Sequence, residues 1–254
     1  MKKLLFTTLF IFGVTMVMAQ DAACSVGLQL GFNQQIIRTN TPISVEGQTP
    51  VWDNRHLNGV KIGFVFEGNI IRGFGALISL NYSYGGGSTS WKKIGIELPY
   101  PRERYRYNLH TLDLACDWQY KFKLAQRTFL ILYTGPAIQC NLSFHEQYFK
   151  QEDISGDITC DTKDQLIRGY QNADDYKAYR RFNVTWGVGI GFQYDRYFIR
   201  GGYDFGLINP LGYDNFDQIV NQQTQKPLYI SQHTSGRQDQ WFIKLGIFLW
   251  QSDK

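Results

Sequence analysis

The sequence predicts an all-β fold: an eight-stranded antiparallel transmembrane β-barrel of up-and-down topology with four long extracellular loops. After residue 24, apolar residues recur with period two in segments of roughly 10 residues, the length of a tilted strand that crosses a bilayer. Short and long connections alternate between these segments. The 254 residues are rich in aromatic residues (16%) and glycine (25 residues), and the mean hydropathy is −0.31. This composition disfavours a helical membrane bundle, which needs several apolar runs of about 20 residues.

The N-terminus has the three parts of a secretory signal. Residues 1–3 carry two lysines, residues 4–17 are apolar, and residues 17–19 (Val-Met-Ala) form a small-residue cleavage site. We therefore expect residues 1–19 to be a Sec signal peptide and residues 20–254 to form the outer-membrane β-barrel domain.

Two alternatives for the N-terminus are weaker. An anchoring helix is disfavoured because the apolar run is short and no charged stop-transfer flank follows it. Lipid attachment at Cys24 is disfavoured because Asp21 occupies a position where a large apolar residue is needed.

The first half of the barrel consists of four predicted strands, 25–34, 59–67, 74–84 and 107–120. In each of them the residues between the apolar ones are mostly glycine or polar. Their apolar faces are Val26, Leu28, Leu30 and Phe32; Val60, Ile62, Phe64 and Phe66; Ala76, Ile78, Leu80, Tyr82 and Tyr84; and Leu112, Leu114, Cys116, Trp118 and Tyr120.

The second half consists of the predicted strands 129–144, 182–194, 197–207 and 240–250. The alternation is weakest in 129–144, where both faces carry apolar residues, and sharpest in 182–194. The apolar faces of the last three strands are Val184, Trp186, Val188, Ile190 and Phe192; Ile199, Tyr203 and Phe205; and Trp241, Ile243, Leu245, Ile247 and Leu249. An even number of strands suits a closed antiparallel sheet whose two termini lie on the same side.

The lengths of the connections support the same topology. Outer-membrane barrels have short periplasmic turns and long extracellular loops, whereas a soluble β-sandwich is not expected to alternate so regularly. The predicted long loops, each longer than about 20 residues, are 35–58, 85–106, 145–181 and 208–239, and the predicted turns are 68–73, 121–128 and 195–196.

A soluble ligand-binding barrel hides its apolar face inside, whereas a membrane barrel turns this face outward. Three features favour the membrane: the signal peptide, the strand length, and aromatic residues at segment ends, which suit the two lipid interfaces. A closed sheet is also the only β-structure that pairs every backbone group in hydrocarbon. The aromatic residues at segment ends are Tyr82, Tyr84, Trp118, Tyr120, Tyr194, Tyr197 and Trp241.

Three stretches carry a family resemblance: LDLACDWQYKF (112–122), TGPAIQCNL (134–142) and FNVTWGVGIGFQYDRYFIRGGYDFGLINP (182–210). With them the chain resembles the PorT-like, porin-family outer-membrane β-barrel domains of Bacteroidota over nearly its whole mature length. The shared features are a Gly-Pro in the fifth strand and a Tyr-Asp-x-Gly-Leu segment ending the seventh. Family members often have Glu-Ile-Pro-Leu in the fourth strand, where this chain has Asp-Leu-Ala-Cys (113–116). The resemblance implies an outer-membrane location and, for some relatives, a part in secretion machinery.

Charged residues at alternating positions are expected to point into the barrel. The interior of an eight-stranded barrel is just wide enough for its own side chains, and buried charges are costly unless they are paired. We therefore expect a salt-bridge network that plugs the lumen. The alternative, a selectivity ring in a channel, would show an excess of one sign. The predicted lumen charges are Lys61, Glu67, Asp113, Asp117, Arg200, Asp204 and Lys244.

The predicted loops carry clustered cations and aromatic residues at the outer rim. Arginine forks and aromatic belts suit the phosphorylated lipopolysaccharide of the outer leaflet. A generic solvated rim close to the membrane is the equally weighted alternative. The candidate lipopolysaccharide-binding residues are Lys92, Lys93, Arg102, Arg104, Arg106, Arg180 and Arg181.

The sequence indicates no catalytic, cofactor-binding or metal-binding residues. Ser143 and His145 form an unspecific pair without a recognisable third member of a triad. The four histidines are better interpreted as solvated loop side chains than as metal ligands. Nucleic acid is an unsuitable partner, because the pI of 8.8 is modest and the compartment is wrong.

Two classes of function remain. The first is a non-enzymatic structural or binding barrel that contacts outer-membrane lipids and lipopolysaccharide or docks with other subunits of an outer-membrane complex. The second is a small-solute channel.

Overall fold

The computed structural model describes residues 23–39, 54–71, 73–88, 92–93, 102–151, 158–165, 180–210 and 236–252. The predicted signal peptide, residues 1–19, lies outside the described residues. Within the described part of the chain, no helix is long and apolar enough to cross a membrane. The strands are β1 (Ala23–Thr39), β2 (Asn54–Ile71), β3 (Phe74–Ser88), β4 (Lys92–Lys93), β5 (Arg102–Ala125), β6 (Thr128–Gln151), β7 (Ile158–Gln165), β8 (Phe182–Tyr194), β9 (Tyr197–Gly206) and β10 (Gly236–Gln251).

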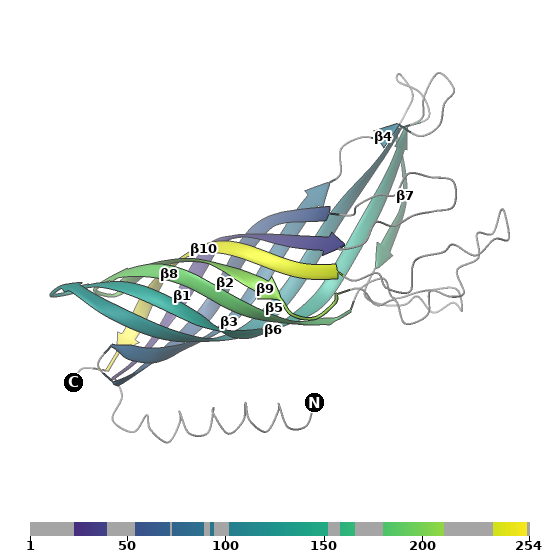
Figure 1. Cartoon of the computed structure of the whole chain (residues 1–254). Coiled ribbons are helices and arrows are strands. Elements are labelled where there is room, and N and C mark those ends of the chain that lie inside the picture. Colours follow the sequence, from purple (N-terminus) through teal and green to yellow (C-terminus); the bar gives the residue numbers. More distant parts are fainter. Residues whose placement is uncertain are drawn as a thin grey trace.

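Eight of these strands close into a barrel (Figure 1). Their order around the ring is β5-β3-β2-β1-β10-β9-β8-β6, and β6 pairs with β5 to complete it. Neighbouring strands are antiparallel, and Ser25 of β1 pairs with Gln251 of β10. The chain therefore enters and leaves the barrel at the same end, and the predicted fold class is confirmed.

The two ends of the barrel differ. At the inner end, β2–β3, β5–β6 and β8–β9 are joined by short turns, which face the periplasm in barrels of this kind. At the outer end lie the long connections. Most of the strands are longer than predicted. The predicted turn 121–128 therefore shrinks to residues 126–127, and β5 and β6 run outward into the predicted loops.

The β5–β6 hairpin turns at residues 126–127, at the inner end. Its open end, formed by the start of β5 and the end of β6, projects beyond the other strands at the outer end (Figure 1). The short strand β4 pairs with β5 next to Glu103, and β7 pairs with β6 along residues 145–151. The alternation of apolar and polar residues did not predict β4 or β7. Both faces of a sheet outside the membrane meet water, so neither face needs apolar residues.

The outer wall of the barrel is apolar. Most of the predicted outward residues are exposed, among them Phe64 (65%), Leu245 (61%) and Leu30 (59%), and the others are partly exposed. Along β3 the intervening residues Ser79, Asn81 and Ser83 are buried. An exposed apolar wall around a polar interior fits a barrel surrounded by lipid.

Aromatic side chains mark both ends of this wall. Tyr194 and Tyr197 flank the β8–β9 turn at the inner end, and both are exposed. Towards the outer end, the Trp241 indole donates a 2.9 Å hydrogen bond to Gln34 Oε1, and its ring lies 5.4 Å from that of Phe32. Tyr82 and Tyr84 are exposed at the outer end of β3.

The interior also holds three apolar clusters. One lies at the outer end, formed by Ile37, Leu57, Tyr107, Leu109 and Phe144. The second, towards the inner end, consists of Val65, Leu77, Phe198 and Phe248, and the third of Ile131, Tyr133 and Phe242. Apolar side chains and polar ones therefore fill the lumen together.

Candidate functional site: the barrel interior and its rim

The structure places all seven predicted lumen charges in the interior, where each is at most 9% exposed. Lys61 of β2 forms an ion pair with Asp113 of β5, with 3.1 Å between Nζ and Oδ1. Asn81 of β3, the strand between them, donates a 2.9 Å hydrogen bond to the other oxygen of Asp113. This carboxylate is thus held by a charge and an amide, as a buried charge requires.

Arg200 of β9 reaches across the lumen to two carboxylates. Its guanidinium lies 3.8 Å from Asp117 of β5 and 4.0 Å from Glu67 of β2, and it donates a hydrogen bond to Gln119. The guanidinium carbon also lies 5.1 Å from the centre of the Tyr133 ring. Arg200 therefore links three parts of the barrel wall through charge and aromatic contacts.

Lys121 is an interior cation that the sequence analysis assigned to a turn. It follows Asp117 and Gln119 on the inward face of β5, because this strand continues to Ala125. Its ammonium pairs with Glu67 and donates a 2.7 Å hydrogen bond to Gln193. Together with Lys121, the predicted lumen charges form a set of four cations and four carboxylates. Continuing the alternation past Tyr120 would have assigned Lys121 to the inward face.

Two of the predicted lumen charges form no direct ion pair. Among the described residues, neither Asp204 nor Lys244 has a partner of opposite charge within 4.0 Å. Asp204 accepts a 2.6 Å hydrogen bond from Gln240, and the Lys244 ammonium lies 4.3 Å from the centre of the Phe242 ring. Polar and aromatic neighbours therefore stabilise these two charges.

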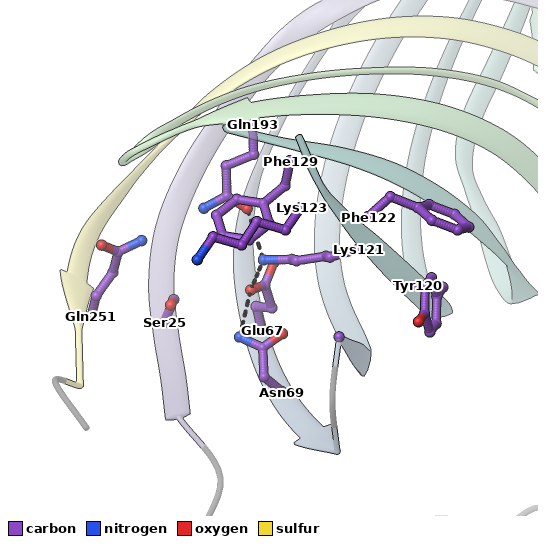
Figure 2. Close-up of a pocket in the computed structure, with 11 residues that line it drawn as sticks. Ser25, Glu67, Asn69, Tyr120, Lys121, Phe122, Lys123, Phe129, Gln193 and Gln251 are labelled. Atoms are coloured by element: carbon purple, nitrogen blue, oxygen red, sulfur yellow. Dashed lines mark hydrogen bonds and ion pairs between the residues drawn. The ribbon is translucent and has the colours of Figure 1, made fainter. Parts of the chain in front are cut away.

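A pocket of about 580 Å³ lies at the inner mouth of the barrel (Figure 2). Lys121 stands in it between Glu67 and Gln193, while Tyr120 and Phe122 point away from Lys121. The remaining lining residues are Ser25, Asn69, Gly73, Lys123, Phe129 and Gln251. The charged centre of the pocket is therefore already neutralised by its own side chains.

The predicted rim residues do not form one cluster. Arg104 and Arg106 lie on the projecting part of β5, and Arg106 is exposed. Arg180 and Arg181 are exposed just before β8. Lys92 and Lys93 form β4, where they pair in register with Glu103 and Arg102 of β5; the side chains of these four residues lie outside the described part.

Two more arginines stand at the outer end, Arg38 of β1 and Arg237 of β10, which pair in register. Arg38 is exposed, and Arg237 forms a 2.8 Å ion pair with the buried Asp239. Sequence reasoning missed them because it assigned both to loops. The period-two pattern that includes Gln34 in β1 and Trp241 in β10, continued to the ends of these strands, would have included Arg38 and Arg237.

The other candidate residues do not assemble into a site. His110 lies opposite Ser143 in the β5–β6 register, and its Nδ1 is 2.6 Å from the hydroxyl of Tyr82. Within the described residues, no group of three His, Cys, Asp or Glu side chains is arranged to hold a metal ion.

Comparisons with known proteins give a family and distant structural likenesses. No curated protein matches the chain. The crystal structure of Ail, the attachment invasion locus protein of Yersinia pestis, in complex with the heparin analogue sucrose octasulfate, is 9% identical, with a TM-score of 0.29. This match covers 90% of this chain and 99% of Ail.

Two further solved structures are similarly distant. Neisserial surface protein A is 8% identical with a TM-score of 0.36, over 87% of this chain and 97% of that protein. A FadL homologue of Pseudomonas aeruginosa is 8% identical with a TM-score of 0.25, over 93% of each chain.

The family assignment rests on a match over most of the chain. The model for the outer membrane protein beta-barrel domain matches residues 18–212, which include β1 to β9 of the described barrel. The protein is therefore an integral outer-membrane protein that belongs to the outer membrane protein beta-barrel domain family.

Proposed function

We propose that this protein is a non-enzymatic structural and binding component of the outer membrane, a subunit that docks with other proteins of a secretion or assembly complex. The resemblance to PorT-like barrels of Bacteroidota favours this role over an isolated barrel. A Sec signal peptide at residues 1–19 would deliver the chain to the envelope.

The observation that carries the proposal is the filled interior. Eight strands leave little room in a barrel, and here the room is taken by ion pairs around Lys61, Arg200 and Lys121 and by three apolar clusters. A lumen filled in this way leaves the wall and the outer end as the surfaces for function.

The outer end offers such a surface. The β5–β6 hairpin reaches past the barrel rim, and β4 and β7 extend its sheet (Figure 1). Segments that project from a rigid scaffold are common binding elements.

The test is purification of a C-terminally tagged chain from its native outer membrane in mild detergent, followed by mass spectrometry of the proteins that accompany it. We expect stoichiometric recovery of other envelope proteins. A variant that lacks residues 150–178 should lose them while its barrel still shows the slower gel migration on heating that marks a folded barrel. Recovery of the tagged chain alone, as a heat-modifiable monomer, would contradict the subunit role.

A small-solute channel is the second candidate, and the pocket at the inner mouth, where Lys121 and Glu67 meet, favours it. Planar-bilayer recordings separate the two. If the interior is a plug, Lys61→Glu and Asp117→Lys should mainly reduce stability and leave the conductance at background. Steady wild-type conductance whose ion selectivity shifts with these reversals would support the channel.

A further inference from the structure

We propose that Arg104 and Arg106, on the outward face of β5, bind the phosphate groups of a lipid in the outer leaflet. This inference goes beyond the proposed subunit role, because it assigns a lipid ligand to one face of the barrel. The proposed ligand is a lipid with a phosphorylated headgroup, which the two guanidinium groups can contact from the side of the barrel.

The height of the two arginines follows from the alternation along β5. Leu112 and Leu114 are exposed on the apolar wall, and the same face continues outward through His110 and Asn108 to Arg106 and Arg104. Each step of two residues advances about 7 Å along the strand. The arginines therefore stand just beyond the apolar band, where headgroups lie.

Aromatic side chains of β3 mark the upper edge of this band. The Tyr84 ring lies 4.8 Å from that of His110, and its hydroxyl donates a 3.2 Å hydrogen bond to Asn108. Tyrosines in such positions sit at the membrane interface. Arg106 is the next residue on this face, so it lies at the level where lipid phosphates begin.

The described residues that face the two arginines in register are uncharged. In register, Arg106 faces Ser88 on one side and Gln147 on the other, and Arg104 faces Phe149. Across the described residues, no carboxylate forms an ion pair with either arginine. Two like charges about 7 Å apart on one face repel each other, and an anion between them removes this repulsion.

The orientation of Arg104 also suits an anion. Its Nη2 donates a 2.8 Å hydrogen bond to Ser88 Oγ, which anchors one end of the guanidinium. A guanidinium has five N–H donors, so one such bond uses a small part of its capacity. Arginine forks bind phosphate in a bidentate manner. Arg237, by contrast, already has Asp239 as its partner.

The experiment measures binding of purified, detergent-solubilised full-length protein to lipopolysaccharide and to the same lipopolysaccharide after enzymatic dephosphorylation. We expect R104A/R106A to bind the phosphorylated form at least tenfold more weakly, and R104K/R106K to fall between this variant and the wild type. The matched control is R127A/R196A, which removes two exposed arginines from the short turns at the opposite end. It should bind like the wild type.

Three outcomes would overturn the proposal: unchanged affinity of R104A/R106A, equal weakening of R127A/R196A, or equal binding of the dephosphorylated lipid. Competition by millimolar inorganic phosphate alone, without preference for the lipid, would assign the site to free phosphate and contradict a lipid ligand. Heat-modifiable migration shows that each variant is folded. No partner protein is present in the lipid-binding experiment. A negative result there would therefore not affect the co-purification test, and a negative co-purification result would not affect the lipid-binding result.

Discussion

At the scale of single residues, the Lys61–Asp113 pair shows why the barrel interior tolerates charge. Both side chains are almost fully buried, and Asn81 supplies a further hydrogen bond to the carboxylate. A buried pair contributes little net stability compared with apolar residues of similar size, but losing one partner leaves an uncompensated charge in a water-poor interior.

This reasoning gives a prediction for Lys61→Met. The change should lower the free energy of unfolding by about 3–5 kcal/mol, because Asp113 loses its direct ion-pair partner and keeps the hydrogen bond from Asn81. The double variant Lys61→Met/Asp113→Leu should recover most of this loss. Urea titration in lipid vesicles, followed by tryptophan fluorescence, measures both values. Equal destabilisation in the single and double variants would show that the charges do not interact.

At the scale of elements, the β5–β6 seam contains a close approach between two strands of the wall. The register of the two strands has no pairing between Cys116–Asp117 and Gly135–Pro136, since proline lacks the donor that a ladder needs. A Cβ atom on Gly135 would lie 2.0 Å from the Cys116 carbonyl oxygen and 2.9 Å from the Asp117 Cα. Glycine at position 135 thus allows β6 to pack against the backbone that carries Asp117.

Gly135→Ala should therefore lower the free energy of unfolding by about 1–3 kcal/mol, because the added methyl group meets backbone that cannot rotate away. Gly201→Ala is the matched control. There a Cβ atom meets its nearest neighbours at 3.6 and 3.7 Å, which is ordinary contact, so the change should stay within about 0.5 kcal/mol. The same urea titration compares them, and similar losses in both would contradict the role of close approach.

The elements also show what the sequence could predict. Where a strand has lipid on one side, an apolar residue is needed at every second position, so the pattern marks strands such as β8 to the residue. The pattern weakens where the wall leaves the bilayer. The fourth predicted strand therefore ends before Lys121, and the start of β5 falls in a predicted loop.

The interior was predictable in part. Alternation assigns a residue to the inside, and the seven lumen charges are buried in the structure. Alternation does not say which side chains meet across the lumen, because that depends on strand tilt and register. The link from Arg200 to Glu67 and the hydrogen bond from Gln240 to Asp204 are contacts of this kind.

At the scale of the whole molecule, the two ends of the barrel face different compartments and carry different structures. Short turns close the inner end, while the β5–β6 hairpin projects at the outer end (Figure 1). In outer-membrane barrels the short turns face the periplasm and the long connections face the cell surface, so we expect the same orientation for this barrel.

This orientation predicts the accessibility of inserted epitopes. A short epitope between residues 154 and 155, in the connection from β6 to β7, should be labelled by antibody on intact cells. The same epitope between Gln126 and Arg127, in the β5–β6 turn, should be labelled only after the outer membrane is permeabilised. Both variants should migrate as folded, heat-modifiable barrels, because surface connections tolerate insertion. Labelling of the 126–127 epitope on intact cells would reverse the orientation, and the arginines of β5 would then face the periplasmic leaflet and lose their lipopolysaccharide ligand.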